Sequence, residues 1–222
     1  MVPVSAEKMA EIDLRAQTEY GISQEALMEK AGMAVADAVL SDISRLQGLE
    51  ILIVCGKGNN GGDGYVAARD LFSKAGDIVK LYTPEVEDIR DGAALTNFKR
   101  AVNSGIAVSR LSSLLSRLDN GATGSIIIDA LLGTGYRGAM TGIYSDIAEK
   151  VNSSGARVYS VDVPSGLNAT TGEAVGQCFN ACKTITFGLP KTGFYSGTGP
   201  KVCGEIIVAD IGFPEELVKE FL

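Results

Sequence analysis

The sequence predicts an α/β protein whose mostly parallel, doubly wound β-sheet is covered by helices on both faces. Short, continuous apolar runs such as ILIVC (51–55) and SIIID (125–129) are typical of strands that are buried on both faces. Segments with helical spacing of apolar residues lie between most successive runs. Right-handed crossovers through those helices make neighbouring strands parallel and produce three layers, helix on sheet on helix.

The expected elements alternate along the chain after a helical N-terminal segment. Residues 5–45 are expected to be helical, with Ser5 as an N-cap, a break at Gly21 and a second cap at Ser23. Strands are expected at 51–55, 78–82, 106–108, 125–129, 157–161, 183–187 and 205–209, and helices at 65–74, 93–104, 111–118 and 144–153. No linker or repeat divides them, so the 222 residues are predicted to form one domain, 1–222.

The bulk composition excludes several kinds of function. A net charge of −7 without a basic tract is a poor match for nucleic acid or an anionic membrane. The sequence has no histidine, which excludes Ser-His-Asp and Cys-His machinery, a His-ligated zinc and a His general base. Any proton transfer therefore falls to Asp, Glu, Lys, Tyr, Cys or water.

The N-terminal residues and the cysteines favour a cytoplasmic protein. The segment MVPVSAEKMAEID has no long apolar run, so we expect neither a signal peptide nor a membrane span. Cys178 and Cys182 are spaced too widely for a C-x-x-C motif, and Cys55 ends an apolar run expected in the core. Reduced thiols in the cytoplasm are therefore the expected state.

The most informative segment is the glycine-rich loop at 56–64, which follows the first strand. Ligands of open α/β sheets bind beyond the carboxyl ends of strands, and five glycines in nine residues let backbone N–H groups approach an anion. A helix expected to begin near Asp63 points its dipole at the same place. Asn59 and Asn60 add amide groups. The loop also satisfies G-x-G-x-x-G, so a dehydrogenase is an alternative, although Thr-Pro precedes the expected acid, Glu85.

Three further strand ends carry a charged or hydroxylic residue. Asp129 and Asp162 each end an apolar strand and precede a glycine turn, where an aspartate is either a turn cap or a functional carboxylate. Ser165 has no histidine to activate it and lies outside any G-x-S-x-G motif, so a cap or an oxygen ligand fits it better than a nucleophile. Lys191 is either a solvated surface residue or a phosphate contact.

Five ordered motifs point to one family. The segments LMEKAGMAVADAV, GNNGGDGYVAARDL, DALLGTGYRG, VDVPSGLNATTG and TFGLPKTG together resemble the NAD(P)H-hydrate epimerase family, the YjeF N-terminal domain family. The resemblance implies a Rossmann-like three-layer αβα sandwich, commonly a homodimer. It implies an isomerase that interconverts the R and S epimers of NADHX and NADPHX, the hydrates of NADH and NADPH. It also implies functional coupling to a separate dehydratase, a domain that some relatives carry themselves.

The resemblance also assigns site residues. It implies that the substrate is bound by Asn59, Asn60, Gly61, Gly62, Asp63, Gly133, Thr134, Gly135, Tyr136, Arg137, Gly138, Ala139 and Asp162. It implies one potassium ion per subunit, held by Asn60, Asp129 and Ser165. These are hard oxygen donors with few charges, which suits a large monovalent cation.

The implied chemistry needs few groups. The epimerised carbon carries a hydroxyl beside a ring nitrogen, so loss and return of water through an iminium, or ring opening and closure, inverts it. Either route requires a carboxylate and a water, and Asp129 or Asp162 is the expected acid/base, with Asp129 slightly preferred. The alternative is a non-catalytic nucleotide-binding or scaffold protein of the same fold. The presence of Asn60, Asp63 and both strand-end aspartates argues against a lost site.

Overall fold

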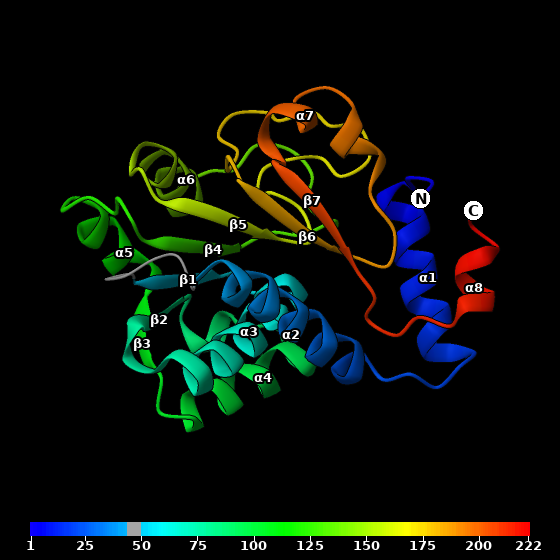
Figure 1. The fold of residues 1–222 in the computed structure, drawn as a ribbon, viewed down its shortest axis with the longest axis horizontal. Coiled ribbons are helices and arrows are strands. Elements are labelled where there is room, and N and C mark those ends of the chain that lie inside the picture. Colours follow the sequence, from blue (N-terminus) through cyan, green and yellow to red (C-terminus); the bar gives the residue numbers. More distant parts are fainter. Residues whose placement is uncertain (44–49) are drawn as a thin grey trace.

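The computed structural model describes residues 1–43 and 50–222. At its centre lies one sheet of seven strands in the order β3-β2-β1-β4-β5-β6-β7 (Figure 1). Every neighbouring pair of strands is parallel. The strands are β1 (Ile51–Cys55), β2 (Val79–Thr83), β3 (Ala107–Arg110), β4 (Ile126–Ala130), β5 (Arg157–Val161), β6 (Lys183–Phe187) and β7 (Glu205–Ala209).

Helices cover both faces of the sheet and its carboxyl edge. Helices α2, α3 and α4 pack against one another on one face, α5 and α6 pack together on the other, and α1 lies beside α8 (Figure 1). The α-helices are α1 (Ala6–Thr18), α2 (Gln24–Ile43), α3 (Asn59–Ala75), α4 (Ala93–Asn103), α5 (Leu111–Leu118), α6 (Ile143–Ser153), α7 (Gly199–Val202) and α8 (Glu215–Lys219). Short 3-10 turns are η1 (Gly76–Ile78), η2 (Val86–Asp88) and η3 (Thr192–Tyr195).

Successive residues of the central strands enter different hydrophobic layers. Ile51 and Ile53 of β1 belong to the layer shared with α1 to α4, whereas Leu52 and Val54 belong to the layer shared with α5 and α6. All residues of β1 are buried. Both faces of the sheet are therefore dry, which is the physical reason for the continuous apolar run in the sequence.

The expected fold class is confirmed, and the sheet is wholly rather than mostly parallel. The helical segment expected at 5–45 is two helices separated at Gly21, which has a φ of +67°, and its last two residues lie outside the described residues. Ser5 caps α1 by accepting a hydrogen bond from the Lys8 amide. The short strand expected at 106–108 is the exposed edge strand β3.

One expectation about the glycine-rich segment is wrong. Helix α3 begins at Asn59 and not near Asp63, so most of the segment is the first turn of a helix instead of an open loop. Tertiary packing explains the difference, because helix propensity disfavours a glycine-rich turn and only its close contacts hold it helical.

Four of those glycines are required by close packing. A Cβ atom on Gly56 would lie 1.9 Å from the Leu131 carbonyl oxygen, and one on Gly61 would lie 2.1 Å from the Gly56 carbonyl oxygen. Added Cβ atoms would meet Met28 at 2.5 Å from Gly62 and the Cys55 sulfur at 2.6 Å from Gly64. Strands β2 and β3 are added on one side of β1 and strands β4 to β7 on the other, so the strand order has a switch point between β1 and β4. These glycines let α3 start directly at that switch point.

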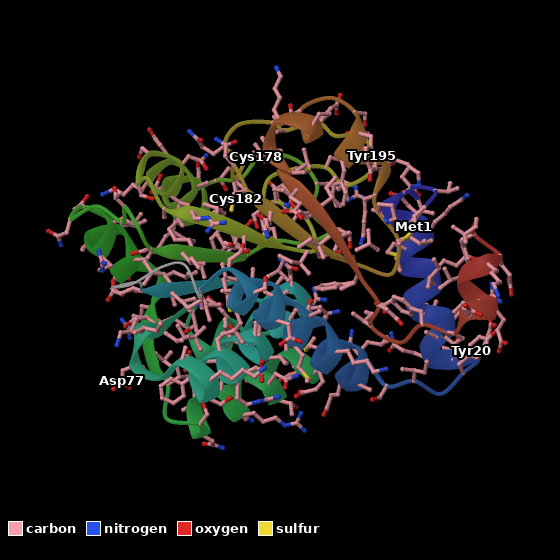
Figure 2. All side chains as sticks on the ribbon, viewed as in Figure 1. Met1, Tyr20, Asp77, Cys178, Cys182 and Tyr195 are labelled. Atoms are coloured by element: carbon pink, nitrogen blue, oxygen red, sulfur yellow. The ribbon has the colours of Figure 1, made fainter. Side chains whose placement is uncertain are left out.

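Two further expectations can be compared with the structure: the absence of a membrane-spanning helix and the state of the cysteines. No helix among the described residues has both the length and the apolar character needed to cross a bilayer. All four cysteines are free thiols. Cys178 and Cys182 lie in the half of the molecule that holds β5 to β7, far from Asp77 (Figure 2).

We predict that Gly61→Ala destabilises the protein more than Gly58→Ala. The new methyl group at Gly61 has no room beside the Gly56 carbonyl, whereas the nearest atom to a Cβ at Gly58 is the Arg90 guanidinium carbon at 3.9 Å. Overpacking of this kind costs about 1 to 3 kcal/mol. Urea unfolding of the two variants measures the difference. Equal midpoints would contradict the packing role.

Candidate active site

A cavity of about 600 Å³ opens at the carboxyl edge of the sheet, at the switch point. Its size suits a small-molecule ligand. Its walls come from α1, α2, the first turn of α3, the segment after β4 and the ends of β5 and β6. It is lined by Met9, Ala10, Asp13, Gln24, Leu27, Met28, Ala31, Lys57, Gly58, Asn59, Asn60, Asp63, Arg90, Leu131, Leu132, Gly133, Thr134, Gly135, Tyr136, Tyr144, Asp162, Phe187, Lys191, Ile211 and Phe213.

The unsatisfied polar atoms of the protein gather in this cavity. Among the described residues, four buried side-chain atoms lack a hydrogen-bond partner: both amide atoms of Asn60 and the hydroxyls of Tyr136 and Tyr144. All three residues line the cavity. Buried polar groups in folded proteins are nearly always paired, so these atoms mark a place where a ligand or an ion supplies the missing partners.

Asp162 is held in an unusual backbone conformation that presents its carboxylate to a buried lysine. It is the only non-glycine residue with a positive φ, +63°, among the described residues. The Val163 amide donates to the Val161 carbonyl across it at 2.7 Å, as in a strained γ-turn. Backbone strain of this kind clusters at functional sites.

Lys191 provides the partner of that carboxylate. Its ammonium group has no solvent exposure and donates to Asp162 Oδ1 at 2.7 Å, to Thr186 Oγ1 at 2.6 Å and to the Phe187 carbonyl at 3.1 Å. Three acceptors satisfy the three donors of a lysine. Lys191 is thus not a solvated surface lysine but a buried counter-ion that Asp162 and the end of β6 hold in place.

Two further carboxyl groups face the same end of the cavity. Burial raises the pKa of Asp63 well above its usual value, and the charges of Asp162 and Asp13 raise it further. Burial and the charge of Asp162 also raise the pKa of Asp13 from α1. A carboxyl group in this setting binds a proton more readily than an exposed one. The cavity therefore has an acidic end that combines one ion-paired carboxylate with protonatable carboxyl groups.

Asp129 has a different position. It is fully buried and does not line the cavity. Its Oδ2 accepts from the Ser160 hydroxyl at 2.9 Å and the Ser165 amide at 2.8 Å, and its Oδ1 accepts from the Ser165 hydroxyl at 2.5 Å and the Leu131 amide at 3.3 Å. Burial raises its pKa to about 6, against the lowering effect of these bonds. Asp129 thus ties β4 to β5 and to the turn that follows Asp162.

The turn at 131–133 connects this cluster to Asn60. The Leu132 amide donates to the Ser165 hydroxyl at 2.9 Å, and Gly133 lies so close to Asn60 that an added Cβ would be 3.3 Å from its side chain. The oxygen-bearing residues Asn60, Asp129 and Ser165 therefore surround one short segment of chain. No group of three His, Cys, Asp or Glu side chains suited to a metal occurs within residues 1–43 and 50–222.

The structure places the predicted substrate residues in two groups. Those that line the cavity are Asn59, Asn60, Asp63, Gly133, Thr134, Gly135, Tyr136 and Asp162. Those that lie outside its lining are Gly61, Gly62, Arg137, Gly138 and Ala139. The first two of these are packed against protein, and the Arg137 guanidinium is ion-paired with Glu7 of α1 at 2.7 Å.

Sequence reasoning missed several lining residues. Asp13 lies on α1, where a charged residue in an amphipathic helix is typical of a solvated face. Arg90 and Tyr144 lie on the connections after β2 and β4, and no motif marks them. The one available signal was the position of these connections beyond the carboxyl ends of strands.

The fold and the cavity define the class of protein: a Rossmann-like α/β protein with a small-molecule site at the switch point of its sheet. Within that class the family follows from comparison. The chain belongs to the family described as YjeF-related protein N-terminus, whose model matches residues 24–193.

Relatives of two lengths are similar to the chain. The NAD(P)H-hydrate epimerase of Elusimicrobium minutum is 38% identical over 99% of this chain and 100% of its own length. The bifunctional NAD(P)H-hydrate repair enzyme of Thermofilum pendens is 39% identical over 94% of this chain, which spans only 40% of that longer protein. A yeast protein of solved structure superposes with a TM-score of 0.84 at 23% identity, covering 100% of this chain and 93% of its own, which confirms the fold.

We predict that Asp129→Asn lowers the free energy of unfolding by about 2 to 4 kcal/mol, because buried unsatisfied or opposed donors carry a cost of this order. Each carboxylate oxygen of Asp129 accepts two hydrogen bonds. In the variant an NH2 group replaces one of these oxygens and cannot accept from the two donors that face it. Chemical denaturation measures the change, with the exposed Asp77→Asn as the control. A variant as stable as the control would show that the cluster is not structural.

Proposed function

We propose that this protein is an NAD(P)H-hydrate epimerase, an isomerase that interconverts the R and S epimers of NADHX and NADPHX as a step of metabolite repair. The observation that carries the proposal is full-length similarity to an epimerase of the same length, at 38% identity. The cavity at the switch point holds the carboxyl groups that the proton transfers of this reaction require.

The reaction is the inversion of a carbinolamine carbon. Protonation of the hydroxyl releases it as water and leaves an iminium, and a water that adds to the other face must lose a proton. An enzyme therefore requires one group that donates a proton and one that accepts it, placed near a developing positive charge. Negative carboxylates suit an iminium and repel phosphates, so the hydrated ring belongs at the acidic end of the cavity.

Asp162 and Asp63 fit these two tasks. The ammonium of Lys191 balances the charge of the Asp162 carboxylate and orients it, so Asp162 is the acceptor of the proton from the incoming water. Burial favours the protonated form of Asp63, so Asp63 is the donor to the leaving hydroxyl. An ion-paired carboxylate and a buried, protonated carboxyl group in one cavity can divide the roles of base and acid between them. Asp129, the carboxylate that the sequence slightly favours as the acid/base, does not line the cavity, so Asp162 fits the role better.

A potassium ion is a proposed component of the site. The buried Asn60 amide has an unpartnered oxygen and lies against Gly133, and the Asp129 carboxylate and the Ser165 hydroxyl contact the same turn at 131–133. This donor set is all hard oxygen with one charge, which fits a large monovalent cation better than zinc or a redox metal. Asn60, Asp129 and Ser165 would hold the ion, and it would neutralise Asp129.

The partners follow from the same proposal. Relatives that join an epimerase to a second function in one bifunctional repair enzyme indicate that this chain works together with a dehydratase. The free cysteines support a location in the cytoplasm, and the family resemblance supports a homodimer. A non-catalytic scaffold of the same fold is disfavoured, because a scaffold has no need for a buried Lys191–Asp162 pair facing a cavity.

The assay that tests the proposal starts from a mixture of NADHX epimers. A stereospecific dehydratase removes one epimer, and chiral chromatography follows the other with and without this protein. We expect both epimers to be consumed completely only when this protein is present. Persistence of the second epimer would refute the proposal, and net hydride transfer to an added substrate would instead indicate a dehydrogenase.

We predict that Asp162→Asn lowers kcat at least about a hundredfold with a much smaller change in KM, the range expected for loss of a general base. Lys191→Met should also lower kcat, since it removes the group that orients Asp162. Lys201→Met, an exposed lysine on α7, is the matched control. Wild-type rates in both site variants would remove this pair from the reaction.

We predict that potassium stabilises the protein at pH 8 and much less at pH 5. The folded pKa of Asp129, about 6, exceeds its ordinary value, so the proton stabilises the folded state at low pH and this contribution is lost as pH rises through about 6. Potassium competes with that proton. One pH unit below the pKa of Asp129, the apparent affinity of the protein for potassium should be about tenfold weaker.

Thermal unfolding in potassium chloride and in choline chloride at both pH values measures this effect. An increase in Tm with potassium that is the same at pH 5 and pH 8 would contradict the role of Asp129. No increase at either pH would contradict the ion site.

A further inference from the structure

The end of the cavity away from Asp162 has the opposite electrical character. Lys57 and Arg90 both line it, and the Arg90 amide donates to the Lys57 carbonyl at 2.8 Å, so the two basic residues are held side by side. The Arg90 guanidinium carbon would lie 3.9 Å from a Cβ on Gly58. Arg90 therefore lies beside the N-terminus of α3, and no carboxylate among the described residues forms an ion pair with it.

Lys57 is only partly neutralised at this end. Its ammonium pairs with Asp88 of η2 at 2.9 Å, and both side chains are about half exposed, at 52% and 50%. Exposed pairs of this kind are weak and readily exchanged. One unpaired guanidinium and one loosely paired ammonium together leave a net positive charge here.

The helix terminus at this end also lacks a cap. Helix α3 has 17 residues, and its N-cap, Gly58, has no side chain to accept from the amides of the first turn. Helix N-termini with free amides bind anions. A second observation is independent of the helix: Asn60, 8% exposed, has an unpartnered amide nitrogen in the same cavity.

Tyr144 supplies a further donor without a partner. It lies in the first turn of α6, lines the cavity, and has a buried hydroxyl that makes no hydrogen bond. The charges of Lys57 and Asp88 both act on this phenol, which places it near Lys57. The side chains that line the cavity at this end are donors or cations, while Asp88 lies outside the lining. None of the family motifs contains Arg90 or Tyr144.

We propose that Arg90, Tyr144 and Lys57, with the N-terminus of α3, form an anion subsite that binds a phosphate group of the dinucleotide substrate. This inference rests on the proposed function for the identity of the substrate. The two ends of the cavity then sort the ligand by charge, with the hydrated ring at the carboxyl groups and the phosphates at the basic end. Two sources exist for the phosphate: the diphosphate bridge, present in NADHX and NADPHX, and the 2′-phosphate, present only in NADPHX.

The test is the binding of ADP-ribose and of its 2′-phosphate, which lack the reacting ring, to Arg90→Ala and wild-type protein by isothermal titration calorimetry. Loss of a charge-assisted hydrogen bond weakens binding roughly tenfold or more. An equal loss for both ligands identifies the diphosphate as the anion. A loss for the 2′-phosphorylated ligand alone identifies Arg90 as a determinant of preference for NADPHX.

Tyr144→Phe provides a second and independent variant. Its hydroxyl has no partner in the protein, so its removal should leave the Tm unchanged or higher while it weakens binding of the same ligand that Arg90→Ala weakens. A tyrosine with a purely structural role would show no change in affinity. Asp88→Asn should act in the opposite direction, because it releases Lys57 from its ion pair and strengthens binding.

Arg110→Ala is the matched control, because this exposed arginine pairs with Glu85 and does not line the cavity. Wild-type affinity of both ligands for Arg90→Ala and Tyr144→Phe would overturn the inference. The outcome is separable from that of the epimerase assay. Arg90-dependent binding without epimerisation refutes the proposed function alone, and epimerisation unaffected by these variants refutes the subsite alone.

Discussion

The close approach of the backbone at Gly56 and Gly61 is the constraint on which the site depends. The Gly56 amide donates to Ala130 at 2.9 Å, and side chains at either glycine would collide with carbonyl oxygens. This contact lets α3 begin immediately at the switch point between β1 and β4. As a result, the helix presents both Asn60 and Asp63 to the cavity, one turn apart.

The two ends of the cavity differ in charge, so they favour different groups of a bound ligand. At one end the strained turn at Asp162 brings a carboxylate onto a fully buried lysine. At the other end Arg90 and an uncapped helix terminus are electropositive. A protein with a net charge of −7 can thus offer an electropositive site to an anion, because local donors and not the total charge decide where an anion binds.

The two strand-end aspartates show how far similar sequence contexts diverge. Asp129 and Asp162 both follow apolar strands and precede glycine turns, and from the sequence either was a candidate acid/base. In the structure Asp129 accepts four hydrogen bonds in a dry interior, whereas Asp162 keeps 14% side-chain exposure and faces the cavity. The difference arises from Ser160 and Ser165, which reach Asp129 from another strand and another turn.

The sequence by itself determined the three-layer parallel fold, the strand positions and the edge of the sheet that holds the site. Burial on both faces of a strand and helical periodicity are local patterns, and parallel strands necessarily end at one edge. Tertiary structure alone decided that the glycines serve packing, that Lys191 is a buried counter-ion and that Asp13, Arg90 and Tyr144 line the cavity. These properties depend on distances between segments far apart in the chain, such as Asp162 and Lys191, which are 29 positions apart, and no local pattern encodes them.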